Sequence, residues 1–307
     1  MLPAYLELLR SGELAERAEK AWSRLRRCSL CPRRCLVDRL AGELGSCRTG
    51  ASARVASAGP HFGEEAPLVG RGGSGTIFFA GCNLACVFCQ NYDLSHLCRG
   101  REEGPGDLAR MMLELQDRGC ANVNLVSPSH VVPQILAALV LAAGKGLRLP
   151  LVYNTGGYDA LATLHLLEGV VDIYMPDMKY ADNSSGERLS GVPDYVDRNR
   201  AVVQEMHRQV GDLETDERRV ARRGLLVRHL VLPGGLAGTA EVARFIAAEV
   251  SPRTYLNVMD QYHPAFDVAR APNLYPEVAR SLRGAEYESA VEEALAAGLS
   301  RLDGMTR

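Results

Sequence analysis

The stretch TIFFAGCNLACVFCQN, residues 76–91, joins a run of strand length to three closely spaced cysteines. Its first five residues are β-branched, aromatic or small and are followed by glycine, which predicts a buried strand ending at a turn. Cys82, Cys86 and Cys89 follow with Cys-x3-Cys-x2-Cys spacing. Three thiolates on one loop can hold three irons of a cubane and leave the fourth iron open. Zinc is the alternative, but structural zinc takes four protein ligands, and Cys98 is the only nearby candidate for a fourth.

Outward from this stretch, apolar runs of strand length alternate with segments of helical periodicity. The predicted strands are residues 76–80, 122–126, 149–153, 171–175, 225–231 and 255–259. Between the first two, Leu108, Met111, Met112 and Leu115 recur at helical spacing. Six βα units are fewer than the eight of a closed barrel, so we expect a partial (β/α)6 TIM-like barrel, with a flat doubly wound sheet as the alternative.

The same pattern divides the chain into three regions. Residues 1–72 form an N-terminal helical and cysteine-rich metal-binding region, residues 73–265 the barrel, and residues 266–307 a C-terminal helical extension. Residues 70–75, GRGGSG, have Gly-x-Gly-x-x-Gly spacing but precede a strand, whereas a dinucleotide site would follow one. We therefore interpret this run as a lead-in to the barrel.

Composition narrows the class of protein. The 307 residues are 47% apolar and 23% charged, which is typical of a folded globular chain. A net charge of −2 favours neither a nucleic-acid nor a membrane partner. We find no signal peptide and no apolar run of membrane-spanning length, so we expect a cytoplasmic protein. Nine cysteines in a reducing compartment indicate metal binding rather than disulfides.

Four further cysteines lie close together near the start of the chain. Cys28, Cys31, Cys35 and Cys47 have the spacing Cys-x2-Cys-x3-Cys-x11-Cys. Four thiols fit a closed tetrahedral site, either structural zinc or an auxiliary iron-sulfur cluster. The spacing alone does not choose the metal.

The cysteine loop, with Phe88 before its last cysteine, resembles the motif of the radical S-adenosylmethionine (SAM) superfamily. Other segments resemble strand-end motifs of pyruvate formate-lyase activating enzyme and its relatives. These segments are YNTGG (153–157), VDIYMPDMK (171–179), VRHLVLPG (227–234) and NVMDQYHP (257–264). The N-terminal cysteine segment is similar to a branch of activating-enzyme-like iron-sulfur proteins.

The resemblance implies a cofactor and a reaction. Cys82, Cys86 and Cys89 would hold a [4Fe-4S] cluster whose open iron chelates SAM. Reductive cleavage of SAM would give a 5′-deoxyadenosyl radical that abstracts hydrogen from a substrate, and the protein would position and shield it. The implied substrate is a protein or peptide. The implied electron donor is a low-potential carrier such as flavodoxin or ferredoxin.

The resemblance also assigns residues to SAM binding. Asn154 stands where the family has an Asp that meets SAM, and Lys179 matches a lysine near the SAM carboxylate. Arg228 matches an arginine on the fifth strand and His263 a histidine after the sixth, while Phe88 offers a ring face to adenine. Structural ion pairs are the alternative interpretation of Lys179 and Arg228.

One segment departs from the family pattern. The family has Gly-Gly-Glu at the end of the second strand, and this chain has Ser-Pro-Ser-His at residues 127–130. We expect the hydroxyls of Ser127 and Ser129, or the carbonyl oxygens beside Pro128, to accept from the SAM ammonium instead. His130 is either a catalytic acid or base or an ordinary histidine at a helix start.

Three functions remain in competition. The first is an enzyme that acts on a protein, as glycyl-radical activating enzymes do. The second is a radical maturase or an enzyme that modifies a small molecule. The third is a non-catalytic electron-transfer or metal-scaffold protein, but an electron carrier would bind its cluster with four cysteines and would not need six βα units.

Overall fold

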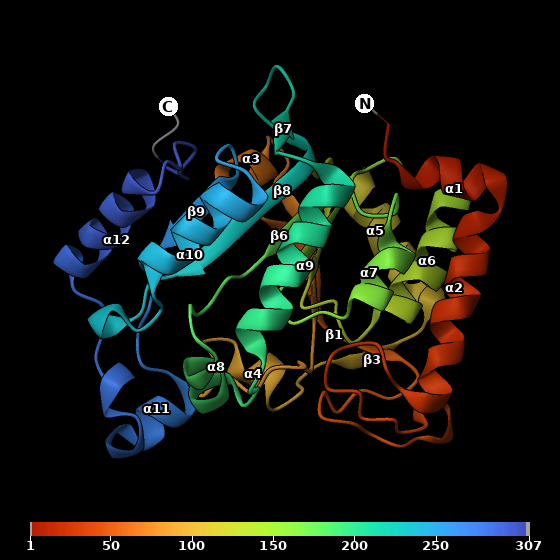
Figure 1. Ribbon diagram of the computed structural model, residues 1–307. Coiled ribbons are helices and arrows are strands. Elements are labelled where there is room, and N and C mark those ends of the chain that lie inside the picture. Colours follow the sequence, from red (N-terminus) through yellow and green to blue (C-terminus); the bar gives the residue numbers. More distant parts are fainter. Residues whose placement is uncertain (1, 305–307) are drawn as a thin grey trace.

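Nine strands form one mixed sheet in this computed structural model, which describes residues 2–304 (Figure 1). The strand order is β3-β1-β2-β4-β5-β6-β8-β7, and β9 pairs with β8. The strands are β1 Ala53–His61, β2 Ser74–Phe79, β3 Arg101–Glu103, β4 Val123–Val126, β5 Leu151–Thr155, β6 Ile173–Pro176, β7 Glu214–Thr215, β8 Ala221–Leu230 and β9 Tyr255–Met259.

Six of these strands are parallel and follow one another in chain order. They are β2, β4, β5, β6, β8 and β9, and each pairs with its predecessor in that series. The six predicted strands are therefore confirmed, as is the mixed α/β class. A doubly wound sheet reverses its strand order near the middle, and this series does not. Sequential order with right-handed connections places the connecting helices on one face of the sheet.

The helices connect these strands and cover the sheet. They are α1 Tyr5–Ser11, α2 Glu13–Ser23, α3 Ala66–Val69, α4 Tyr92–Ser95, α5 Pro105–Asp117, α6 Val132–Gly144, α7 Leu161–Leu167, α8 Asn183–Ser190, α9 Tyr195–Val210, α10 Thr239–Phe245, α11 Phe266–Arg270 and α12 Gly284–Ala296. Figure 1 shows α9 and α10 on the face of the sheet turned toward the viewer. No helix within residues 2–304 is long and apolar enough to cross a membrane.

The outer face of the sheet carries the largest apolar core. Alternate strand residues such as Leu125 and Leu151 point toward the helices and are fully buried. The N-terminal helices extend this core, because α2 packs against α6. Two hydrogen bonds hold the start of α1 to the rest of the fold. There the Ala4 N–H donates to Asp172 at 2.9 Å and the Tyr5 hydroxyl donates to the Leu149 carbonyl oxygen at 2.9 Å.

The inner face of the sheet is filled by the short helix α3. Leu68 of α3 is fully buried and belongs to one cluster with Val152, Ile173 and Leu226, which alternate with the outward residues of their strands. This cluster occupies the inner face near the strand starts. The carboxyl ends of the strands are left for polar side chains.

The sheet crosses the predicted boundary at residue 72. β1 lies before that residue and pairs antiparallel with β2, with Ala58 opposite Ile77. The sequence analysis did not predict β1, β3 or β7. β1 contains Gly59 and Pro60 and is only partly buried, so it lacks the continuous apolar run that marks the parallel strands.

Candidate functional site

The cysteine loop after β2 is fixed by a neighbouring helix and by a sharp turn. The Ala85 N–H donates to the Ser190 carbonyl oxygen of α8 at 3.0 Å. Gly81 has φ +84°, and a β-carbon there would lie 2.4 Å from the Cys47 carbonyl oxygen. Glycine satisfies both demands because it has no β-carbon. The Gly-Cys pair therefore determines where the loop leaves the strand.

All three thiols of this loop line one cavity of about 370 Å³ at the carboxyl ends of the parallel strands. Polar residues from successive strand ends complete the wall: Ser127, Ser129, Asn154, Thr155, Asp177, Lys179 and Arg228. The fold therefore brings most of the residues that the sequence singled out into one place.

Burial strongly affects the pKa of two thiols of this cavity, those of Cys82 and Cys86. It raises the pKa of Cys82 to about 12, and the neighbouring Cys86 adds to the shift. Burial also raises the pKa of Cys86, while the nearby Lys179 ammonium opposes that rise. Such thiols are protonated at neutral pH, so metal binding must displace their protons.

A three-residue ion cluster forms one side of the cavity. Asp177 accepts from Lys179 Nζ at 2.5 Å and from Arg228 Nε at 2.9 Å. Burial alone would raise the pKa of Asp177, but Arg228 and Lys179 hold it below its usual value. The predicted alternative, in which the two cations form structural ion pairs, thus describes real contacts. Glu64 lines the same cavity and lies near Arg228, so the two cations are balanced by two carboxylates. The Lys179 ammonium lies near the Cys86 thiol, where a bound carboxylate would meet it.

The other strand ends offer an amide without a hydrogen-bond partner and hydroxyls that already have one. Asn154 lines the cavity, and its side-chain amide has no hydrogen-bond partner within residues 2–304, so it is available to a ligand. Ser129 Oγ instead lies 2.9 Å from Thr155 Oγ1, which donates to Asp159 at 2.6 Å. Ser127 has φ +60°, a conformation that few side-chain-bearing residues adopt.

Two predicted residues do not reach this cavity. Phe88 is buried against the Tyr262 ring, with 5.7 Å between the ring centroids. His263 is exposed, and its Nδ1 lies 3.3 Å from the Gln90 amide nitrogen. Neither lines the wall around the three thiols. Their assignment to SAM binding stays a prediction.

The structure adds residues that the sequence analysis missed. Hydroxyl groups lie beside two of the thiols: Ser190 Oγ is 3.0 Å from Cys86 Sγ, and Ser95 Oγ is 3.1 Å from Cys89 Sγ. Tyr195 is fully buried, and its hydroxyl accepts from the Lys179 N–H at 3.2 Å. These residues come from α4, α8 and α9, and no spacing in the sequence links them to the cysteines.

The four N-terminal cysteines line a second, smaller cavity. The segment doubles back on itself there, because the Cys28 N–H donates to the Val37 carbonyl oxygen at 2.9 Å. Burial raises the pKa of Cys31 to about 12 and also raises that of Cys47. A β-carbon at Gly45 would lie 2.8 Å from Cys35 Sγ, so a larger residue there would require the Cys35 side chain to move. All four thiols line this one small cavity.

The two cavities share a wall. Asn83 and His130 line both of them. Arg33 Nε donates to the Asn83 carbonyl oxygen at 2.8 Å, and Arg39 donates to the His130 carbonyl oxygen at 2.7 Å. Burial lowers the pKa of His130 to about 4, and its Nε2 lies 3.0 Å from the Ala80 carbonyl oxygen. His130 is thus a neutral hydrogen-bond donor within this wall.

The donor sets can be tested against the metals that they would hold. Within residues 2–304, no three His, Cys, Asp or Glu side chains converge closely enough to hold one metal ion. A cubane binds each thiolate through a different iron, so its ligands stand farther apart than those of a single ion. Three thiols around an open polar cavity fit a cluster with one free iron. Four thiols around a much smaller cavity fit a site closed by four protein ligands.

The fold and the cavities define a mixed α/β protein with a three-cysteine cavity at its strand ends and a separate four-cysteine region. No family model matches the chain. The chain is 33% identical over 295 residues to the uncharacterized protein MJ0674 of Methanocaldococcus jannaschii, a match that covers 94% of this chain and 80% of that protein. The chain belongs to the family of MJ0674.

Solved structures overlap with parts of the chain. SuiB of Streptococcus suis, bound to its precursor peptide SuiA, matches with a TM-score of 0.43 and 15% identity over 64% of this chain and 43% of that one. A radical SAM methyltransferase from Sphaerobacter thermophilus matches with a TM-score of 0.46 and 12% identity over 73% of this chain and 64% of that one. The chain thus spans less than two thirds of either structure.

Proposed function

We propose that this protein is a radical SAM enzyme. One observation carries the proposal: the thiols of Cys82, Cys86 and Cys89 share a cavity with the Lys179 ammonium and with the unpartnered amide of Asn154. A cluster on three thiolates keeps one iron for a ligand, and the other groups suit the charged and polar ends of an amino-acid derivative.

Each wall residue has a role in this proposal. Lys179 and Arg228, held by Asp177, meet the SAM carboxylate through charge-assisted hydrogen bonds. Asn154 bonds the ribose hydroxyls, and Ser127 accepts from the SAM ammonium. Ser129 orients this end of the site through its bond to Thr155.

The cofactor supplies the difficult chemistry. When bound, a [4Fe-4S] cluster would provide the electron that splits SAM into methionine and the 5′-deoxyadenosyl radical. The chain's part is to bind SAM beside the thiols and to keep water from the substrate. We also infer that the sequential parallel strands, wrapped around α3, form the partial (β/α)6 barrel of the radical SAM type.

The substrate proposal rests on the motif resemblance. The strand-end segments resemble activating enzymes that act on proteins, so we propose a protein or peptide substrate and a flavodoxin-like or ferredoxin-like electron donor. Maturation of another cofactor or modification of a small molecule is the second candidate, because a cavity of about 370 Å³ lies within the size range of small-molecule sites.

The N-terminal region has a separate role in this proposal. Cys28, Cys31, Cys35 and Cys47 hold either zinc or an auxiliary iron-sulfur cluster. Four thiols around one small cavity suit either metal, and metal analysis decides between them.

Anaerobic reconstitution with iron and sulfide, followed by mass spectrometry for 5′-deoxyadenosine, tests the proposed function. With SAM and a low-potential reductant we expect 5′-deoxyadenosine to form in the reconstituted protein and not in protein without iron. Reconstituted protein that contains iron but forms no 5′-deoxyadenosine would contradict the proposal.

A further inference from the structure

A large open groove lies at the amino ends of the parallel strands, and the cysteine cavity lies at their carboxyl ends. The volume of the groove is about 1490 Å³, and its wall is built from the starts of the parallel strands, from α3 and from the hairpin that joins β7 to β8. In Figure 1, α3 and β7 lie at one end of the sheet and α4 and α8 at the other. The buried cluster around Leu68 lies on the inner face between the two ends. The groove and the proposed active site therefore lie at opposite ends of the strands, and of their lining residues they share Glu64 alone.

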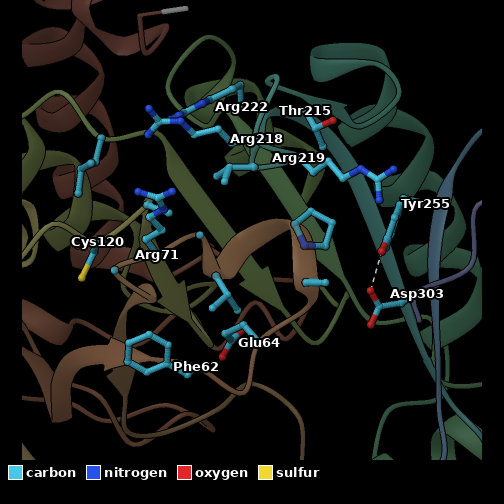
Figure 2. A pocket seen from close by; sticks show the side chains of 18 of the residues that line it. Phe62, Glu64, Arg71, Cys120, Thr215, Arg218, Arg219, Arg222, Tyr255 and Asp303 are labelled. Atoms are coloured by element: carbon cyan, nitrogen blue, oxygen red, sulfur yellow. Dashed lines mark hydrogen bonds between the residues drawn. The ribbon is translucent and has the colours of Figure 1, made fainter. Parts of the chain in front are cut away.

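Five arginines line this groove: Arg71, Arg218, Arg219, Arg222 and Arg301. Figure 2 shows Arg71, Arg218 and Arg222 gathered on one side of the opening, with Arg219 on the side of Tyr255. They come from segments far apart in the sequence, and the fold brings their guanidinium groups around one space.

The described carboxylates of the groove do not neutralise this charge. Only Glu64 and Asp303 line it, so the five arginines leave an excess of three positive charges. Glu64 already accepts from Asn124 at 3.0 Å, and Asp303 accepts from the Tyr255 hydroxyl at 2.6 Å. Asp216 of the hairpin pairs with Arg222, which reduces the excess to two.

Three of the arginines remain without a counter-charge. Arg222 donates to the Asp216 carboxylate. Arg301 donates to two backbone carbonyl oxygens. The side chains of Arg71, Arg218 and Arg219 make no ion pair or hydrogen bond within residues 2–304, and all three are exposed. Like charges around one space repel one another, and an anionic ligand would relieve that repulsion.

Two backbone features place arginines at the rim of the groove. Gly72 approaches the Gly119 carbonyl oxygen so closely that a β-carbon would lie 1.9 Å from it. This contact explains the glycine-rich run before β2, which brings Arg71 to the rim. On the other side, Arg219 has φ +62° in the tight turn of the hairpin, a strained conformation for an arginine.

The size and lining of the groove indicate the kind of ligand. Its volume exceeds the roughly 300–1,000 Å³ of ordinary small-molecule sites, so it suits an extended segment. Apolar side chains such as Phe62, Pro67 and Val220 lie between the arginines, and they would contact peptide side chains. A nucleic acid needs a broad basic surface for its phosphates, and the whole chain carries a net charge of −2.

We propose that this arginine groove binds an acidic segment of a protein partner. Carboxylates of the segment would pair with Arg71, Arg218 and Arg219, and its apolar side chains would contact the wall between them. The proposal does not rest on the proposed function, because none of the five groove arginines lines the cysteine cavity, and Glu64 is the one residue that the two linings have in common.

Fluorescence anisotropy with a labelled peptide of about ten glutamates tests the groove directly. We expect the Arg218→Gln, Arg219→Gln double variant to bind about tenfold more weakly, because it loses two exposed ion pairs. Arg71→Gln, on another segment of the rim, should also weaken binding. The matched control is Arg26→Gln, Arg27→Gln, which removes the same charge from two neighbouring exposed arginines outside the groove.

The outcomes separate the proposal from non-specific attraction. Thermal melting checks that each variant is folded, and a glutamine peptide of equal length checks that binding needs carboxylates. Weaker binding in the groove variants with unchanged binding in the control supports the proposal. Absent binding, equal losses in both double variants, or tighter binding of a single-stranded RNA of equal length would overturn it.

Discussion

The two cysteine sites lie on either side of one wall, yet they differ in number, access and surroundings. The loop after β2 offers three thiols to a polar cavity of about 370 Å³ that also holds Asp177, Lys179 and Arg228. The N-terminal segment offers four thiols to a much smaller cavity. Three ligands leave a metal cluster one open position, whereas four close it.

This difference assigns the two sites separate roles. The first site has room, charge and an unpartnered amide, which are the features that a small ligand needs. The second lies in a segment with few large apolar residues, and metal binding can stabilise such a segment where burial does not. We therefore attribute chemistry to the first site and stability to the second.

The largest effect should come from removing one thiol of the first site. We expect Cys86→Ser to abolish 5′-deoxyadenosine formation while the protein stays folded, because a cluster held by two thiolates is labile. Cys120→Ser is the matched control, since Cys120 is also buried but lies far from both cysteine groups in the sequence. Undiminished product from Cys86→Ser under the same reductant would contradict the assignment of this loop.

Removing one thiol of the second site should lower the stability of the protein. Zinc contributes about 10–16 kcal/mol to the folding of small finger peptides, so we expect Cys31→Ala to lower the free energy of unfolding by at least about 3 kcal/mol. Denaturant unfolding measures this with and without a chelator. The loss should shrink when a chelator has removed the metal from both proteins. A loss of equal size after chelation would show that packing, rather than metal, is responsible.

A smaller effect is expected from the cation beside the first site. Lys179→Ala should weaken SAM binding by about ten- to a hundredfold, since a charge-assisted hydrogen bond contributes about 1.5–3 kcal/mol. Asp177 would keep Arg228 as its partner, so the fold should survive. Calorimetry of the iron-loaded protein measures the affinity, with the exposed Lys145→Ala as the control. Equal affinity in both variants would leave Lys179 with the structural role of an ion-pair partner.

The smallest effect should come from pH and lie outside both sites. Burial lowers the pKa of His229 to about 4, and its Nδ1 donates to the Met178 carbonyl oxygen at 2.6 Å. The unfolded chain takes up this proton near pH 6.5, so stability should fall by about 1–3 kcal/mol as pH decreases from about 6.5 to about 4. Unfolding of the metal-free protein measures the slope. His229→Gln should make the slope shallower without abolishing it, because buried His130 has a similarly lowered pKa. An unchanged slope would assign the effect to other groups.

The sequence predicted the parallel strands well because each is a short, continuous apolar run. The run at residues 225–231 covers the second half of β8 and one residue beyond it, and the run at residues 255–259 is β9 itself. β1 was missed because its hydrogen-bond partners lie beyond residue 72, and its own residues are neither continuous nor strictly alternating in polarity. Its position is thus a result of pairing rather than of local pattern.

The residues of the candidate site that come from the ends of successive strands could be predicted from the sequence. Residues after successive strand ends, such as Asn154 and Lys179, meet because parallel strands end at one edge. Ser190 and Tyr195 were not predictable, since they reach the site from α8 and α9 across the fold. Phe88 follows the motif in sequence, but its ring packs against Tyr262 and not into the cavity.

Metal analysis of the Cys82→Ala, Cys86→Ala, Cys89→Ala triple variant tests the separation of the two sites most directly. Purified without oxygen or chelator, this variant should form no 5′-deoxyadenosine and should still retain one metal centre at the N-terminal cysteines. About one zinc per chain would identify a zinc site there, and about four irons an auxiliary cluster. A variant that retains no metal, or one that still cleaves SAM, would contradict the account of two separate sites.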